Sequence, residues 1–346
     1  MRRVIMCICV ILLFVQPVLA LDINAPKAPK SIEEYMPEKV SSFGEDLLLI
    51  IKNILPTIAP SAADASRICL ALVGIVLLVS LTDYYSEKQS IVTNLVCVVS
   101  VGVVLVQPVN AMIDLGVKTV TEITEYGKLL LPVMTSALAA QGGVTASAAL
   151  YAGTAFFSSL LSSFITGVAV PLIYVFMCLA LVNCAFEDKT IQSFRDFSKW
   201  LVTWILKMIL YIFTGYMGIT GVISGTADAS AVKATKLAIS GAVPVVGGIL
   251  SEASEAILIS AGVMKSAAGV YGILTVLTLF LGPFLKIGLQ YILLKITTAV
   301  CYGFGTKKAV DVIQNFTVSM GLILAMTGTV CLLQLISTVC FMKGVN

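Results

Sequence analysis

The chain has 346 residues, of which 58% are hydrophobic and only 12% are charged. An average soluble domain carries about 25% charged residues, so this composition excludes an ordinary soluble protein and indicates a polytopic membrane protein. The formal net charge is +3, without the clustered basic surface that nucleic acids require, so no nucleic-acid partner is expected.

The sequence contains no histidine. Catalytic triads, histidine-based zinc sites and histidine proton relays are therefore excluded. Of its nine cysteines, only Cys7 and Cys9 are close in sequence, and they lie in the predicted leader. The others lie in or beside apolar segments, where cysteine packs as a small hydrophobic residue. We predict no metal, no cofactor and no enzymatic activity.

The N-terminal region predicts export. Arg2 and Arg3 precede the apolar run 4–14, and the small residues at Val18–Ala20 are typical of a signal peptide that is cleaved after Ala20, although an uncleaved anchor is the alternative. Residues 21–66 are the most polar part of the chain, so we expect a short extracytoplasmic segment whose helix, Leu47–Leu55, lies on the membrane or on a partner. Residues 67–346 then form a multi-pass domain.

Six to eight transmembrane helices are expected in this all-α domain, beginning at about 68–82 and 91–113. Between spans, the i,i+4 pair of Lys118 and Glu122 predicts that residues 116–128 form an amphipathic helix in the membrane interface. Residues 129–186 are long enough for two spans, or for three short ones. Gly215, Gly218, Gly221 and Gly225 have the spacing that lets neighbouring helices approach closely.

Loop orientation is ambiguous in the sequence. The positive-inside rule places the amphipathic segment 187–200 and the turn with Lys307 and Lys308 in the cytoplasm. If the mature N-terminus lies outside, this arrangement requires three crossings before residue 187. Two crossings fit the lengths of the apolar segments more naturally, so both orientations stay open.

The stretch 226–266 differs from an ordinary span because it combines charged residues with a proline and a pair of glycines. Such a sequence predicts a broken or re-entrant segment that is shielded by other helices or lines a wet cavity. We predict that breaks in the fold are set by six residues: Pro132, Gly142, Gly143, Pro244, Gly247 and Gly248.

Charged side chains within apolar sequence are candidates for a polar path or a partner contact. They are Asp228, Lys233, Lys236, Glu252, Glu255 and Lys286, the last with Gln290 one helical turn away. For Glu252 and Glu255 the alternative is an interfacial helix with its carboxylates in water. Ser230 and Lys233 have the spacing of some Ser/Lys hydrolases, but none of the companion motifs of those enzymes is present.

Three ordered stretches resemble one family: LLLPVMTSALAAQGGVTASAAL at 129–150, TADASAVKATKLAIS at 226–240 and PVVGGILSEASEAI at 244–257, followed by AGVYG at 268–272. Together they are similar to stage III sporulation protein AE of endospore-forming bacteria. Here Ser240-Gly241-Ala242 replaces the more hydrophobic sequence that usually precedes the proline of this family.

The resemblance implies a subunit of the secretion-like channel complex that connects mother cell and forespore. Such a subunit would lie in the mother-cell-derived outer forespore membrane, beside other membrane subunits, a separate cytoplasmic secretion-type ATPase and ring-forming intermembrane subunits. No catalytic residue is carried over from the family. The alternative, favoured by the two Pro/Gly-containing segments at 132–143 and 244–248, is a self-contained secondary transporter or permease for a small solute.

Overall fold

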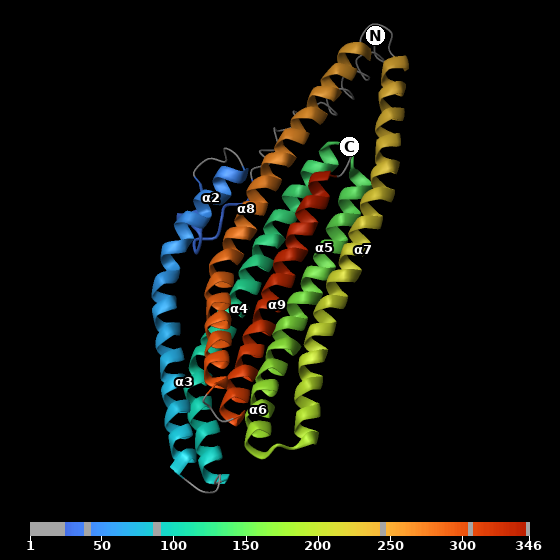
Figure 1. Cartoon of the computed structure of the whole chain (residues 1–346). Helices are drawn as coiled ribbons and strands as arrows, with labels where there is room; N and C mark the ends of the chain where they lie inside the picture. Colours follow the sequence, from blue (N-terminus) through green and yellow to red (C-terminus); the bar gives the residue numbers. More distant parts are fainter. Residues whose placement is uncertain (1–24, 38–42, 86–90, 243–246, 304–306, 344–346) are drawn as a thin grey trace.

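The computed structural model describes residues 25–37, 43–85, 91–242, 247–303 and 307–343, with side chains except at 83–85, 91, 94, 221–242 and 247–265. Within these ranges every regular element is helical, as predicted (Figure 1). The order is η1 (Glu33–Tyr35), α2 (Phe43–Ile54), η2 (Leu55–Ile58), α3 (Ala59–Tyr85), α4 (Ile91–Ala140), α5 (Val144–Phe164), η3 (Ile165–Ala169), α6 (Val170–Phe186), α7 (Lys189–Ala242), α8 (Gly247–Tyr302) and α9 (Lys307–Lys343).

Six helical stretches are long and apolar enough to cross a membrane, within the predicted range of six to eight. They are Phe43–Thr82, Leu95–Ala140, Val144–Phe186, Lys189–Thr220, Ser266–Tyr302 and Lys307–Lys343 in the described part of the chain. At ~1.5 Å per residue the longest helices exceed the ~30 Å hydrocarbon core of a bilayer. The helices run side by side along the long axis of the molecule (Figure 1).

Helix α9 forms the centre of the bundle. In the most apolar 18-residue part of α9, 61% of the residues are buried, whereas the corresponding value for the stretch Phe43–Thr82 of α2 and α3 is 22%. It packs against α4, α5, α6, α7 and α8, while α3 covers α4 and α8 from one side. Large side chains such as Phe213, Phe316 and Phe341 fill the interior. Because lipid replaces water around such a bundle, apolar side chains remain on its outer faces, for example Leu70 of α3 and Val103 of α4.

Several helices continue through proline. Helix α4 contains Pro108 and Pro132, and α8 contains Pro283. Helices α5 and α6 are joined by the π-helical turn η3, directly before Pro171. Proline lacks an amide hydrogen and crowds the preceding turn, and membrane helices absorb both effects through local rearrangements of this kind.

The turn at residues 141–143 separates α4 from α5. Gly142 has φ of 92°, a conformation that glycine adopts without the steric cost of a Cβ atom. The amide N–H groups of Gly142 and Gly143 donate to carbonyls at the end of α4, which completes the helix terminus. Gly142 and Gly143 are therefore part of the reversal of the chain, whereas Pro132 lies inside α4.

The expectation for residues 116–128 was wrong. They do not form a separate interfacial helix but lie in the middle of α4, with Val120, Ile123 and Tyr126 buried against the other helices. The i,i+4 charge pair is present, yet it occupies one exposed edge of a long packed helix. Consequently residues 129–186 supply the end of α4 and one complete stretch, α5 to α6, rather than two or three full spans.

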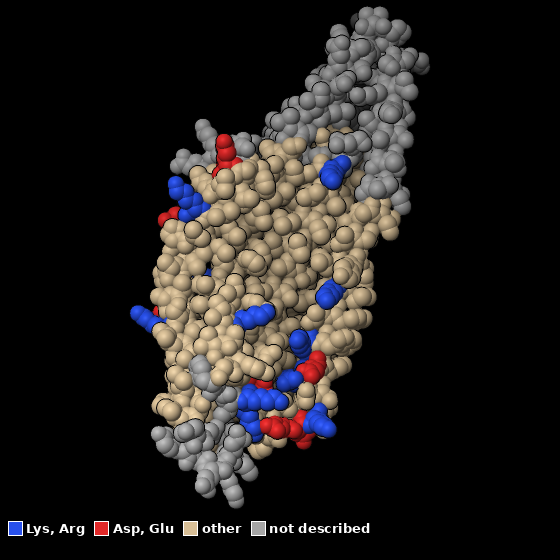
Figure 2. Space-filling model, in the orientation of Figure 1, with Lys and Arg blue, Asp and Glu red and all other residues tan. Residues whose placement is uncertain are grey.

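This count bears on the loop ambiguity. Three membrane-length stretches precede residue 187, so a chain that begins outside would place the start of α7 inside. The start of α7 and the start of α9 lie at the same end of the bundle, where charged side chains gather (Figure 2). For a chain that begins outside, the number of crossings and the positive-inside rule therefore place the start of α7 on the same side, the cytoplasm.

Two of the four glycines of α7 do not make the predicted close approach, and Gly221 and Gly225 lie outside the residues whose side chains are described. A Cβ atom on Gly215 or Gly218 would meet nothing within 4 Å, so these two glycines face open space. Close approach instead occurs at Gly153 of α5, where a Cβ atom would overlap the ring of Tyr216 from α7. The Tyr216 hydroxyl donates to the carbonyl of Ala149 at 3.0 Å, which fixes the ring in place.

We expect Gly153→Ala to destabilise the bundle by about 1–3 kcal/mol, because the added methyl group overlaps a ring that is held by its own hydrogen bond. Gly215→Ala is the matched control. It should leave stability unchanged or raise it by up to about 1 kcal/mol, since alanine is the better helix former. Thermal unfolding of the purified protein in detergent measures both; equal midpoints for the two variants would contradict this packing.

Asp188 caps the first turn of α7. Its carboxylate accepts hydrogen bonds from the backbone N–H groups of Thr190 at 2.6 Å and Ile191 at 3.3 Å. These bonds favour the charged form and lower the pKa of the Asp188 carboxyl below its usual value. Just before it, Glu187 adopts a left-handed conformation with φ of 54° that ends α6, and its carboxylate pairs with Lys308 at 3.2 Å.

The depressed pKa gives a testable pH dependence. Stabilisation by Asp188 is present above the ordinary pKa of a free Asp, about 3.9, and is lost as the pH falls through the lower pKa of the folded state. In Asp188→Asn the neutral amide caps the helix at any pH, so its unfolding temperature should fall less between pH 5 and pH 3 than that of the wild type. Parallel falls in the two proteins would refute the capping role.

Candidate functional site: a polar pocket between the N-terminal segment, α4 and α8

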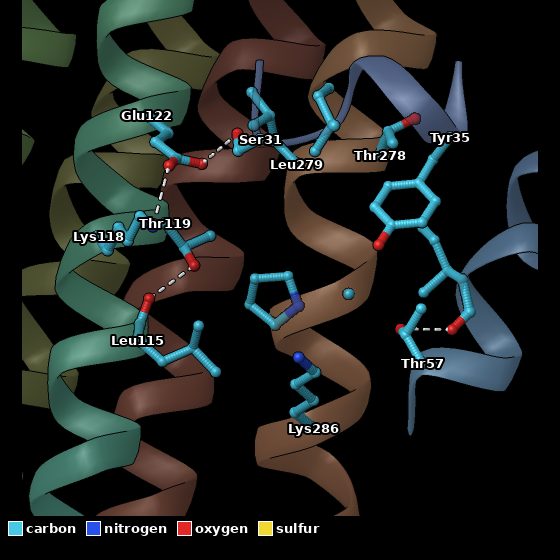
Figure 3. A pocket seen from close by; sticks show the side chains of 14 residues that line it. Ser31, Tyr35, Thr57, Leu115, Lys118, Thr119, Glu122, Thr278, Leu279 and Lys286 are labelled. Carbon is cyan, nitrogen blue, oxygen red and sulfur yellow. Dashed lines mark hydrogen bonds and ion pairs between the residues drawn. The ribbon is translucent and has the colours of Figure 1, made fainter. Parts of the chain in front are cut away.

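A pocket of about 220 Å³ lies at the junction of the N-terminal segment, η2, α4 and α8 (Figure 3). Each element contributes side chains from a different part of the sequence. The lining consists of Ser31, Ile32 and Tyr35 from the N-terminal segment, Ile54 from the end of α2, Thr57 from η2, Leu115, Lys118, Thr119 and Glu122 from α4, and Thr278, Leu279, Gly282, Pro283 and Lys286 from α8.

The N-terminal segment, residues 25–37, is bound to the bundle by long-range contacts. The amide N–H of Ala28 donates to the hydroxyl of Tyr271 at 3.3 Å, and the sulfur of Met36 lies 3.4 Å from the hydroxyl oxygen of Thr278. Ile32 is only 6% exposed and joins the main hydrophobic core. This segment therefore forms one wall of the pocket.

Helix α2 supports the neighbouring wall. Its buried side chains Ile50 and Ile54 pack with Leu274 of α8 in a small second core. The sequence predicted that the apolar face of this helix would lie on the membrane or on a partner; part of it lies on α8 of the same chain. Leu48 and Leu49 remain exposed on the opposite side.

Helix α4 contributes a charge pair to the rim. Glu122 accepts a hydrogen bond from the Ser31 hydroxyl at 3.2 Å and pairs with Lys118 at 3.8 Å. The side chain of Lys118 is 70% exposed and that of Glu122 is 25% exposed. An ion pair this exposed contributes little to stability. The hydrogen bond from Ser31 is the contact that joins the Glu122 carboxylate to the N-terminal segment.

Helix α8 contributes the second cation. Lys286 is partly buried and lines the pocket one turn after Pro283 on the same helix (Figure 3). Within the described residues it makes no hydrogen bond or ion pair. Because Pro283 has no amide hydrogen, the carbonyl of Leu279 lacks its usual helical donor. Lys286 is also the single charged residue between Ser266 and Leu294.

Of the predicted polar residues, the structure places Lys286 in this pocket. Gln290, one turn further along, is 4% exposed, and its side-chain amide nitrogen has no partner among the described residues. Asp228, Lys233 and Lys236 belong to the helical run of α7, and Glu252 and Glu255 to that of α8, but their side chains lie outside the described residues. Helix α8 begins at Gly247 and Gly248, and Pro244 lies outside the described residues.

Sequence reasoning missed the other pocket residues. It assigned Lys118 and Glu122 to an interfacial helix, and it treated Ser31 and Tyr35 as part of a solvated segment. The charge pair at i,i+4 was a real signal, but nothing in the sequence pairs Glu122 with Ser31 or Ala28 with Tyr271. Those contacts join residues that are 91 and 243 positions apart.

The similarity to a known protein family extends over most of the chain and is not confined to the pocket. A sequence model of the family described as stage III sporulation protein AE matches residues 38–344, which include almost every described helix. The chain belongs to this family. The predicted resemblance is therefore confirmed, and the protein is a sporulation-family protein with multiple membrane-length helices.

Stage III sporulation protein AE of Bacillus subtilis (strain 168) is similar to this chain, with 19% identity over 253 residues. The alignment covers 72% of this chain and 63% of that relative, so the chain spans less than two thirds of the relative's length. No solved structure matches the chain. At this level of identity the comparison supports the family and carries no information about individual pocket residues.

The pocket wall formed by residues 25–37 should depend on Ile32. We expect Ile32→Ser to release this segment, because burial of an isoleucine side chain contributes about 1.5–3 kcal/mol. Hydrogen exchange of the amides in 26–36 should then be about ten-fold to hundred-fold faster, while the amides of α9 keep their protection. Glu33→Ser, at an exposed neighbouring position, is the control. Unchanged exchange in Ile32→Ser would show that the wall is held by other contacts.

Proposed function

We propose that this protein is a membrane-embedded, non-enzymatic subunit of a sporulation-specific, secretion-like channel complex that connects mother cell and forespore. Membership of the stage III sporulation protein AE family carries this proposal. The six membrane-length helices support it, because they give the chain the form of an integral membrane subunit. Its place would be the mother-cell-derived outer forespore membrane.

Apolar side chains on the outside of the bundle support a role among other membrane subunits. On α7, Trp200 and Trp204 stack with ring centroids 5.7 Å apart, and both are about half exposed. Exposed tryptophan is typical of the membrane–water interface and of contacts between proteins. Other membrane subunits and ring-forming intermembrane subunits are the proposed partners.

The orientation we propose places the starts of α7 and α9 in the cytoplasm. Lys189 and Lys199 in the first turns of α7, and Lys307 and Lys308 at the start of α9, belong to this end. The ion pair of Glu187 and Lys308 joins the α6–α7 turn to the start of α9. The charged residues of the turn and of α9 therefore form one continuous surface. A separate cytoplasmic ATPase of the secretion type would meet the subunit on this side.

Deletion of the chain in its spore-forming host tests the proposal. We expect engulfed forespores that fail to mature and a loss of heat-resistant spores, both restored when the full chain is expressed from a second locus. A tagged version should fractionate with membranes and be located around the forespore by fluorescence. Normal sporulation of the deletion strain would contradict the proposed role.

A self-contained transporter for a small solute is the second candidate, and the half-buried Lys286 in a pocket within the bundle is the observation that favours it. The two functions differ in what the chain does alone. Solute flux into liposomes that contain only this protein would support the transporter. Dependence of its stability in cells on the other membrane subunits would support the complex.

A further inference from the structure

The pocket carries an excess of positive charge. Two ammonium groups, of Lys118 and Lys286, line it together with one carboxylate, that of Glu122. Glu122 is already paired with Lys118 and bonded to Ser31. Lys286 remains as a partly buried cation for which the described part of the chain supplies no counter-ion. A cation among apolar helices is costly to keep and usually has a ligand or a partner.

The apolar part of the lining indicates an amphiphilic ligand. Ile32, Ile54, Leu115 and Leu279 form hydrophobic walls around the two cations. Leu55 and Phe284, each next in sequence to a lining residue, are 60% and 39% exposed. On a membrane-spanning bundle, exposed side chains of this kind face lipid tails. An anionic group in the pocket could therefore continue into an acyl chain along Leu55 and Phe284.

We propose that the pocket between the N-terminal segment, α4 and α8 binds the phosphate group of an anionic membrane lipid, with Lys286 as the main contact and Lys118 at the rim. Lysine binds phosphate as a compact point charge with three donors. The Ser31 bond to Glu122 keeps the single carboxylate turned toward α4 and the N-terminal segment, so that it does not neutralise Lys286. This site is independent of the channel complex proposed above.

The test uses the full chain, purified in detergent with its lipids removed and kept in phosphate-free buffer. Phosphatidylglycerol, phosphatidylcholine and inorganic phosphate are titrated separately, and binding is measured by native mass spectrometry and by the unfolding temperature. We expect binding of phosphatidylglycerol with a rise in the unfolding temperature, and little effect of the other two. If inorganic phosphate gave the full rise in unfolding temperature and phosphatidylglycerol did not bind, the proposal that the bound phosphate group belongs to a lipid would be wrong.

Variants locate the site. Lys286→Gln should bind phosphatidylglycerol about ten-fold more weakly, which is the loss expected for one charge-assisted hydrogen bond, and Lys286→Arg should bind it nearly as well as the wild type. Lys207→Gln, which removes an exposed lysine of α7, is the control for general attraction between lipid and positive charge. Equal affinities of Lys286→Gln, Lys207→Gln and the wild type would refute the proposal.

A second variant keeps the test decisive if Lys286→Gln fails to fold, which circular dichroism and size-exclusion chromatography would show. Lys118→Gln removes the rim cation from a different helix, at an exposed position that the fold does not require. It should weaken phosphatidylglycerol binding several-fold relative to Lys207→Gln. Affinity equal to that of Lys207→Gln would overturn the assignment of the pocket as the lipid site.

Discussion

Backbone hydrogen bonding in the absence of water is the constraint on which this structure depends. A peptide group among lipid tails can find its partner only inside its own helix, so interruptions are disfavoured at membrane depth. This explains why α4 continues through Pro108 and Pro132 and why α8 continues through Pro283. The one full reversal between α4 and α5 occurs at Gly142, with its carbonyl acceptors supplied by the end of α4. Proline therefore modifies the local helix here, whereas the glycine pair permits the turn.

The same constraint places polar chemistry at a few positions. Most threonine and serine hydroxyls in the helices donate to the carbonyl three or four residues earlier, as Thr278 does to Leu274 and Thr317 to Ile313. Such groups need no partner on another helix. The direct contact of Thr154 with Ser337, at 2.6 Å, is one of the places where two buried hydroxyls join different helices. Against this background Lys286 is an exception, because it is partly buried and has no counter-ion in the described part of the chain.

Composition and apolar segment lengths were sufficient to predict an all-α membrane protein with at least six spans, and ordered motifs were sufficient to predict its family. Local patterns gave less reliable information about individual segments. The charges of Lys118 and Glu122 gave the correct helix face but suggested the wrong location, because the sequence does not show that Val120 and Ile123 pack on neighbouring helices. The pocket depends on residues far apart in the chain, and a single sequence contains no signal for such pairs. Lys286 was identifiable because it is an isolated charge in a long apolar run.

The bond between Ala28 and Tyr271 has a consequence for biosynthesis. Its two partners are 243 residues apart, and the earlier one leaves the ribosome long before the later one exists. At synthesis rates of about 5–20 residues per second, the N-terminal segment waits roughly ten to fifty seconds before α8 can receive it. During that interval α8 is not yet present for the segment to bind, and Ile32 is not yet buried in the hydrophobic core. The polar character of residues 25–37 suits such a wait, since the segment can stay in water until the helix that completes the pocket has been inserted.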